Sequence, residues 1–203
     1  MKVGAVLLAA GGSSRFGQPK QLLSFGAETL VRRAVRAASA CCSPVIVVVG
    51  REEKEIATEL HDVAVQIVPN DDWEKGIGSS LRRGIEASPA SEGVIVLTCD
   101  QPFVDETFIR ELITTHQKTG QPIVASAYAD TLGVPAFFLA CLREELCALP
   151  DANGAKSIIA CHPDQVATVN FPLGAIDIDS AADYENAKKI WRERLSYHRR
   201  RSA

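Results

Sequence analysis

Residues 3–20 read VGAVLLAAGGSSRFGQPK, and this stretch decides the fold. Residues 3–10 form a nearly continuous apolar run, which is typical of a parallel strand covered on both faces. The chain then turns into a loop that contains Gly11, Gly12, Arg15 and Lys20. Ligands of parallel α/β sheets bind at the carboxyl ends of the strands. Backbone N–H groups at glycines, together with two cations, suit phosphate oxygens. The stretch therefore predicts a first strand followed by a triphosphate-binding loop.

The alternation of strand, loop and helix continues along the chain. It predicts a mostly parallel sheet in a three-layer α/β/α arrangement, with a Rossmann-like nucleotide-binding half. The predicted strands are 3–10, 45–50, 63–68 and 93–98, and the predicted helices are 28–40, 52–60, 77–87 and 105–120. Asp105 is placed to cap the last of these helices and Gly120 to end it.

Beyond Pro122 the elements become shorter. Two strands are expected around a turn near Asp130, followed by two short helices and two late strands, and a final helix capped by Ser180. The expected strands are 123–129, 134–140, 165–170 and 175–179, and the expected helices are 141–148, 154–161 and 180–195.

Composition limits the class of protein. The 203 residues, 46% of them hydrophobic, fit one domain over residues 1–195 with a basic tail at 196–203. The net charge of -3 and the pI of about 5.8 disfavour nucleic-acid binding. The six cysteines include no C-x-x-C pair, and no apolar run approaches the roughly 20 residues of a membrane span. We expect a cytoplasmic protein with reduced thiols and neither a nucleic-acid nor a membrane partner.

Two common phosphate motifs do not fit the first loop. Gly12 to Gly17 has the spacing of G-x-x-x-x-G-K-[ST], but Gln18 and Pro19 stand where Lys and Ser/Thr are required. The G-x-G-x-x-G fingerprint is absent, which disfavours a dehydrogenase.

The segment LLAAGGSSRFGQPKQLL (7–23) resembles the L-A-A-G-x-S-x-R-M-G-x-x-K signature of nucleotidyltransferases of the molybdenum cofactor type. Phe16 stands where the family usually has Met, which exchanges one bulky apolar side chain for another. The resemblance implies a fold of the nucleotide-diphospho-sugar transferase type and a loop that grips the triphosphate. The nucleotide-binding residues it implies here are Leu8, Ala9, Ala10, Gly11, Gly12, Ser13, Arg15 and Lys20.

Two further segments add candidate nucleotide and metal ligands. VPNDDWEKGIGSSLRRGI (68–85) resembles the family's N-x-x-W-x-x-G-x-x-x-S segment, which points to Asn70 and Ser79 as nucleotide-binding residues. VIVLTCDQPFV (94–104) is a strand that ends at Asp100, where a carboxylate suits Mg²⁺ bound together with substrate phosphates. The CDQP form is similar to the cytidylyltransferase branch of the family.

The acceptor side and the second metal ligand are expected in the C-terminal half. LGVPAFFLA (132–140) resembles the family's G-x-P-x-x-F segment, and Gly154 and Lys156 fit the second half of its G-D-x-G-A-R motif. This points to Gly133, Pro135, Gly154 and Lys156 on the acceptor side. Asp151 and Ala152 replace the Gly-Asp of that motif, which leaves the acceptor open.

The family's D-[IV]-D-T-P-E-D-Y close corresponds to residues 177–184, DIDSAADY. If residues 175–179 form a strand, Asp177 and Asp179 point to one face because side chains alternate. Either could complete the metal site with Asp100, and we favour Asp177.

The resulting hypothesis is a Mg²⁺-dependent enzyme that transfers CMP from CTP to a molybdopterin-type acceptor and releases pyrophosphate. Lys20, Arg15 and Asp100 are the candidate catalytic residues. The alternatives are another nucleotide, a sugar or polyol phosphate acceptor, or a non-catalytic pterin carrier that docks on a molybdoenzyme.

Overall fold

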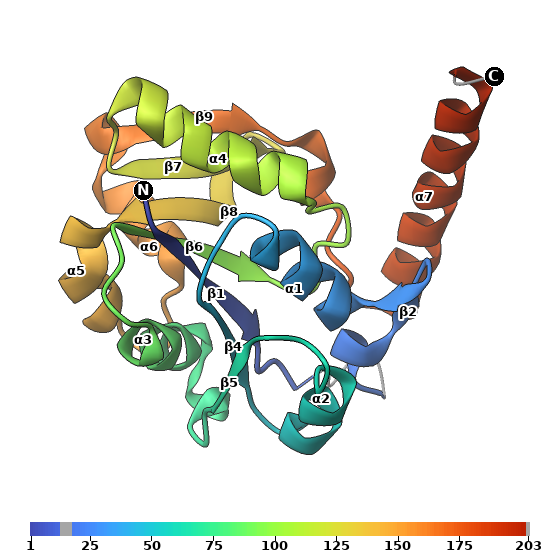
Figure 1. Cartoon of the computed structure of the whole chain (residues 1–203), viewed down its shortest axis with the longest axis horizontal. Helices are drawn as coiled ribbons and strands as arrows, with labels where there is room; N and C mark the ends of the chain where they lie inside the picture. The colour runs from blue at the N-terminus through green and yellow to red at the C-terminus, as the bar shows by residue number, and fades with distance from the viewer. Residues whose placement is uncertain (13–17, 202–203) are drawn as a thin grey trace.

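The computed structural model describes residues 1–12 and 18–201, without the side chains of residues 197–201. Within these residues the centre of the molecule is a seven-stranded sheet in the order β5, β4, β1, β6, β8, β7, β9 (Figure 1). β8 runs antiparallel to β6 and β7, whereas the other pairs are parallel. This confirms the mostly parallel α/β fold. The strands are β1 (Val3–Ala9), β4 (Val45–Val49), β5 (Gln66–Pro69), β6 (Gly93–Thr98), β7 (Ile123–Tyr128), β8 (Thr131–Leu139) and β9 (Val166–Asn170).

Helices cover both faces of this sheet. In β1, Ala5 and Leu7 belong to one buried core, while Val6 and Leu8 belong to the other, because successive side chains of a strand point to opposite faces. Each core is closed by helices, so the three-layer arrangement is confirmed. The first face carries α1 (Leu30–Ser39) and α4 (Glu106–Thr119); the second carries α3 (Ile77–Ala87), α5 (Arg143–Cys147) and α6 (Ala155–Cys161).

Local capping chemistry sets the ends of α4 as the sequence predicts. The Asp105 carboxylate accepts a hydrogen bond from the backbone N–H of Phe108 at 2.9 Å. Gly120 adopts a left-handed conformation with φ of 70°, which a glycine allows without steric cost, and its N–H donates to the carbonyl of His116.

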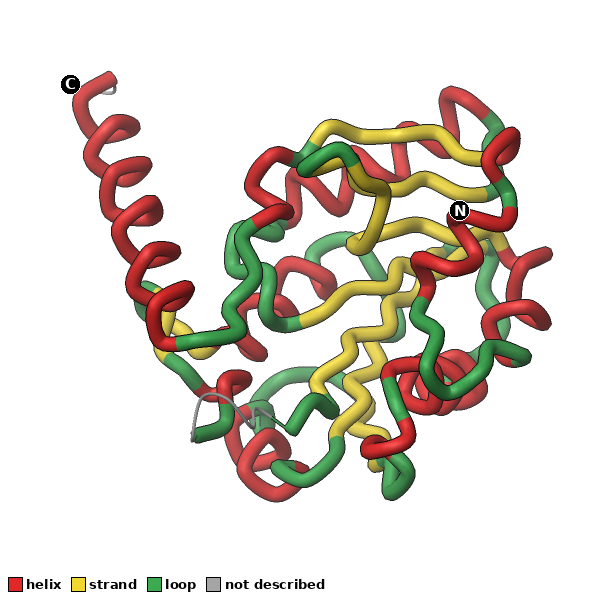
Figure 2. The backbone as a smooth tube through the Cα atoms, turned by 180° about the vertical axis from the view of Figure 1, so that it is seen from behind, coloured by secondary structure: helices red, strands yellow, loops and turns green. Residues whose placement is uncertain are grey.

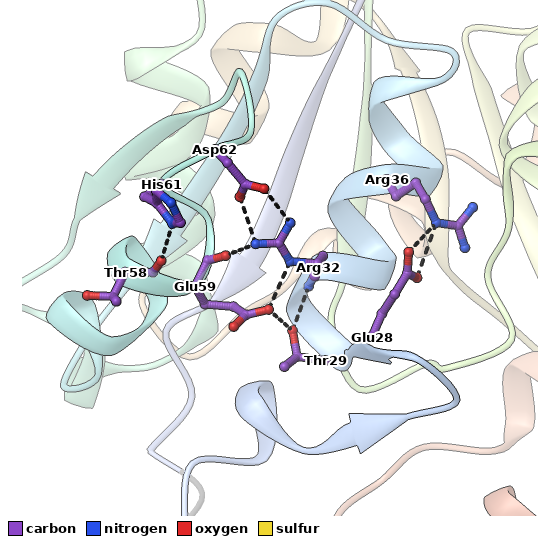
Figure 3. Close-up of polar contacts among 8 residues, drawn as sticks. All are labelled: Glu28, Thr29, Arg32, Arg36, Thr58, Glu59, His61 and Asp62. Carbon is purple, nitrogen blue, oxygen red and sulfur yellow. Dashed lines mark hydrogen bonds and ion pairs between the residues drawn. The ribbon is translucent and has the colours of Figure 1, made fainter.

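A polar cluster joins α1 to α2 (Glu53–Glu59). Arg32 donates to the Glu59 carboxylate at 2.9 Å and to the Asp62 carboxylate at 2.8 Å, and also to the Glu59 carbonyl (Figure 3). The Thr29 hydroxyl donates to Glu59 and accepts from the backbone N–H of Arg32. Thr29 is thus the N-cap of α1, which explains why the helix predicted from residue 28 begins at Leu30.

The C-terminal helix α7 (Ala181–Arg201) begins against the domain and then extends away from it (Figures 1 and 2). Its Trp191 ring lies 5.5 Å from the ring of Phe25, and the guanidinium of Arg33 lies 4.2 Å above it. Phe25 belongs to a short hairpin formed by β2 (Ser24–Phe25) and β3 (Glu28–Thr29), which the sequence does not predict. The helix is longer than predicted, since it continues past residue 195.

Three predicted strands differ from the structure. The strand predicted at 134–140 is β8, which spans Thr131–Leu139. The strand predicted at 63–68 is β5, which starts at Gln66 because the Val63 N–H is used in a turn to Leu60. The strand predicted at 175–179 is wrong. These residues end a 3₁₀ turn and then cross the edge of the sheet without a strand partner. The short 3₁₀ turns are η1 (Lys20–Leu22), η2 (Trp73–Lys75), η3 (Ala140–Leu142), η4 (Pro163–Gln165) and η5 (Pro172–Ala175).

None of the six cysteines forms a disulfide. None of the helices in the described part of the chain combines the length and the apolar character that crossing a bilayer requires.

Candidate active site

The backbone at the carboxyl end of β1 is fixed by a buried glutamine. Gln21, fully buried in η1, donates from its side-chain amide to the carbonyls of Ala9 at 2.9 Å and Gly11 at 2.6 Å. Gly12 lies against the ring of Trp73, and a Cβ there would come within 2.6 Å of that ring. Only a glycine allows this approach, so the start of the loop has a fixed course over Trp73.

A hollow of about 290 Å³ opens beside this segment, at the carboxyl ends of β1 and β6. Two of the three candidate catalytic residues line it, Lys20 and Asp100. The third, Arg15, and the predicted ligand Ser13 lie outside the described residues. The predicted nucleotide-binding residues found in the lining are Leu8, Ala9, Ala10, Gly11, Gly12, Lys20 and Asp100.

Asn70 and Ser79 do not line this hollow. The Asn70 side-chain amide donates to the hydroxyls of Ser79 and Ser80 at 3.0 Å each, and its oxygen accepts from the N–H of Asp72. Both residues are buried, so the structure gives them the role of fixing the turn before α3, and their contact with a nucleotide stays a prediction. Ser80, in the same segment, lines the hollow, as do Trp73, Glu74, Gly76 and Ile77, which were not assigned from the sequence.

Lys20 lies between two carboxylates. Its Nζ is 2.8 Å from Oδ2 of Asp100 and 2.9 Å from Oδ1 of Asp179. Burial alone would lower the pKa of Lys20, but the charge of Asp100 and hydrogen bonds to both carboxylates raise it above its ordinary value. Lys20 is therefore a permanent cation at the edge of the hollow.

The segment that carries Asp177 and Asp179 is anchored by the residue between them. The Ile178 N–H donates to the carbonyl of Asp100 at 3.0 Å, and the Ile178 side chain is fully buried. The neighbouring residues Asp177 and Asp179 are more exposed than Ile178. The segment is a loop rather than the predicted strand, and the charge of Asp179 acts on Asp177.

Asp177 lies close to two other carboxylates, those of Asp100 and Asp179. Desolvation by the surrounding protein, followed by the charges of Asp100 and Asp179, raises its pKa to about 6. A divalent cation would relieve this repulsion, and carboxylate oxygens are the ligands that Mg²⁺ prefers. Within the described residues no three acidic, histidine or cysteine side chains are arranged to hold a metal ion, and Lys20 contacts both Asp100 and Asp179. The donor chemistry of Asp100 and Asp177 fits a hard divalent cation.

Asp177→Asn is expected to raise the melting temperature at pH 8 in metal-free buffer. A carboxyl group whose pKa is raised by folding destabilises the folded state when it ionises. This penalty is absent below the ordinary pKa of 3.8 and complete above about 6, so the gain should shrink on acidification. Thermal unfolding at pH 8 and below pH 5 tests this, with Asp164→Asn in exposed η4 as the control. A lower melting temperature for Asp177→Asn at pH 8 would contradict it.

A second hollow, of about 620 Å³, lies at the turn between β7 and β8 and beside α6. Because β7 is parallel to β1 and β6, this turn is at the same edge of the sheet as the first hollow. Of the predicted acceptor-side residues, Lys156 lines it. Its lining is Ala127, Tyr128, Ala129, Asp130, Thr131, Leu132, Lys156, Ile159, Ala160, Pro163 and Asn170.

The other three acceptor-side residues have packing roles nearby. Gly133 lies against the Tyr128 side chain, and Pro135 is buried, its carbonyl accepting from the Ser126 hydroxyl. Gly154 lies against Ile77, which lines the first hollow, since a Cβ on Gly154 would be 3.2 Å from it. Their contact with an acceptor stays a prediction.

Asp151, which differs from the family's G-D-x-G-A-R motif, has a structural role. Its carboxylate pairs with Arg82 on α3, and its carbonyl accepts from the N–H of Gly78 at 2.8 Å. This carboxylate is thus engaged in holding the loop before α6 against α3.

The mostly parallel sheet, with Gly11, Gly12 and the Lys20–Asp100 pair at the carboxyl ends of its strands, is typical of a nucleotide-binding α/β protein. Residues 5–167 match the family model described as "MobA-like NTP transferase domain". The chain belongs to this family.

The proteins that this chain resembles are named for more than one activity. The chain is 33% identical over 117 residues to nicotine blue oxidoreductase of Paenarthrobacter nicotinovorans, which covers 57% of each chain. It is 25% identical over 173 residues to the molybdenum cofactor guanylyltransferase of Rhizobium meliloti, covering 83% of this chain and 78% of the relative. The match to the first of these relatives spans little more than half of its length.

A solved structure extends the likeness over nearly the whole chain. The crystal structure of Rv0371c from Mycobacterium tuberculosis superposes with a TM-score of 0.77 and 26% identity, covering 93% of this chain and 98% of that one. A further crystal structure of the same protein is a complex with manganese, with a TM-score of 0.73 and 23% identity.

Proposed function

We propose that this protein transfers CMP from CTP to a molybdopterin-type acceptor, with Mg²⁺ as cofactor, and releases pyrophosphate. The observation that carries the proposal is the position of Lys20 and Asp100 at one hollow, where the strands β1 and β6 end. The relative named molybdenum cofactor guanylyltransferase supports the acceptor class. The cytosine base is inferred from the CDQP sequence at residues 99–102, and GTP is the principal alternative.

In the proposed reaction an oxygen of the acceptor phosphate attacks the α-phosphorus of the nucleotide. The new P–O bond forms as the bond to the β-phosphate oxygen breaks, and pyrophosphate leaves with that electron pair. This chemistry depends on positioning and charge more than on a nucleophilic side chain. An acceptor phosphate is ionised at pH 7, so no protein base has to remove a proton from it.

In this proposal, different groups of the chain contribute to binding and to the reaction. Backbone N–H groups of Gly11 and Gly12 donate to phosphate oxygens, and the ammonium of Lys20 balances the charge that develops on the leaving pyrophosphate. Asp100 and Asp177 would hold Mg²⁺, which when bound offsets negative charge on the phosphates. The backbone at Gly11 is fixed by the hydrogen bond from Gln21 to its carbonyl.

The acceptor is proposed to occupy the larger hollow at the turn between β7 and β8. Lys156 supplies a cation for an acceptor phosphate, and Asn170 and Thr131 supply hydrogen-bonding groups. Tyr128 lines this hollow. The pKa of the Tyr128 hydroxyl is raised mainly by burial and then by the charge of Asp177, which therefore lies nearby. The acceptor would thus lie next to the carboxylates that serve the nucleotide.

The test is pyrophosphate release from purified protein with Mg²⁺ and each of CTP, GTP, ATP and UTP, with and without molybdenum-loaded molybdopterin. We expect release that needs both CTP and the pterin, and a Lys156→Met variant that needs more pterin for the same rate. Release with GTP would change the base, and release with a sugar or polyol phosphate would change the acceptor. Nucleotide binding with no release for any pair would favour a pterin carrier.

The oxidoreductase among the relatives calls for a parallel measurement. Oxidation of NADH or NADPH with a pterin or an extended aromatic substrate would show a redox activity, and we expect none because the chain lacks G-x-G-x-x-G. A cytoplasmic location and docking on a molybdoenzyme stay predictions.

A further inference from the structure

Asp179 has a contact that the proposed function does not use. It precedes α7, but it is not the cap of that helix. The Ser180 hydroxyl accepts from the N–H of Asp183, and the Asp183 carboxylate accepts from the N–H of Ser180 at 2.9 Å. These reciprocal bonds form a capping box, which leaves the Asp179 carboxylate to pair with Lys20 at 2.9 Å.

The backbone on both sides of this pair is fixed. Lys20 begins η1, whose Gln21 is hydrogen-bonded to the end of β1. Asp179 follows the buried Ile178, whose N–H is bonded to Asp100. The Lys20 side chain is only 14% exposed, so its ammonium is held where it is rather than moving freely in solvent.

The same ammonium occupies a position that a divalent cation needs. A metal ion bound by Asp100 would need the Asp100 carboxylate, and the Lys20 ammonium already contacts Oδ2 of that carboxylate at 2.8 Å. The two cations therefore compete for one carboxylate, whereas Asp179 can keep Lys20 beside the hollow after Lys20 leaves Asp100.

We infer that Asp179 is a positioning residue for Lys20, and that Lys20 and a divalent cation compete for Asp100 in the nucleotide-free protein. This inference rests on the proposed function. Lys20 leaves Asp100 when nucleotide phosphates are present to receive its ammonium, while Asp179 keeps it within reach of them. Metal and nucleotide consequently bind with positive coupling, and the metal alone binds weakly.

The experiment measures Mn²⁺ binding to the full chain by electron paramagnetic resonance of the free ion, with and without CTP and in the absence of an acceptor. We expect Lys20→Met to bind Mn²⁺ alone about tenfold more tightly than the unchanged protein, and to lose a similar factor of coupling to CTP. Lys75→Met, which removes an exposed lysine paired with Asp72, measures the general effect of one lost positive charge. Equal Mn²⁺ affinities for Lys20→Met and Lys75→Met would overturn the competition.

Asp179→Asn separates a positioning role from metal ligation. If Asp179 acts through Lys20, the substitution raises the CTP concentration needed for half-saturation when Lys20 is present. In the Lys20→Met background it leaves both CTP and Mn²⁺ affinity unchanged. If Asp179 were a metal ligand, it would weaken Mn²⁺ binding by the same factor in both backgrounds, and that result would refute the inference. These affinities do not depend on turnover, so failure to release pyrophosphate with any acceptor would count against the proposed function alone.

Discussion

Lys20→Ala is expected to lower nucleotidyl transfer by about a hundredfold or more, which is the typical loss when a preorganised charge is removed from a transition state. Lys20 is the cation that lines the described part of the nucleotide hollow at 2.8 Å from Asp100. Its raised pKa keeps it charged at every working pH. The loss should appear in the maximal rate, because charge on the leaving pyrophosphate is largest in the transition state.

The controls separate lost chemistry from lost folding. Removing Lys20 leaves Asp100 and Asp179 unbalanced, so Lys20→Met, which keeps most of the alkyl stem, should be compared with Lys20→Ala by circular dichroism and thermal unfolding. Lys188→Met removes an ordinary surface pair with Glu185 and should leave the rate unchanged. Full turnover of a folded Lys20→Ala protein would show that the site is wrongly assigned.

The sequence predicts the centre of the sheet well, because its strands are buried on both faces. β1, β4 and β6 are short, nearly continuous apolar runs between loops, which is typical of parallel strands covered on both faces. The short hairpin formed by β2 and β3 has no comparable signal. It holds only two residues per strand, and Phe25 is buried against Phe103 and Trp191, which come from distant parts of the chain.

The position of a site residue can be predicted from the sequence where that residue follows a strand. It cannot be predicted where it depends on contacts between residues far apart in the chain. Asp100 comes two residues after Thr98, the last residue of β6, so its place at the edge of the sheet follows from the strand alone. Asp179 meets Lys20 across 159 positions of sequence, and no local pattern reports that pairing. The resemblance of residues 68–85 to a family segment points to Asn70 as a nucleotide ligand, and that contact stays a prediction. The sequence does not show that the buried Asn70 amide bonds to Ser79 and Ser80.

Phe137→Ala is expected to destabilise the protein by about 3–5 kcal/mol, the usual cost of truncating a fully buried phenylalanine. Phe137 is 0% exposed, lies on the antiparallel strand β8, and stacks on His116 with ring centroids 4.5 Å apart. It is paired with Ile95 of β6, so its ring helps to join the parallel half of the sheet to the C-terminal strands. Urea denaturation measures the change.

A second substitution, at Gly93, tests the packing of the Phe137 ring. A Cβ on Gly93 would overlap the Phe137 ring, so Gly93→Ala alone should cost about 1–3 kcal/mol through overpacking. In the Phe137→Ala background the new methyl group enters the space the ring has left, so the double variant should be more stable than the sum of the two changes by about 1–3 kcal/mol. Phe138 points to the opposite core, so Phe138→Ala and Gly93→Ala should add. Additive behaviour of the Phe137 and Gly93 changes would mean that the ring of Phe137 does not fill the space above Gly93.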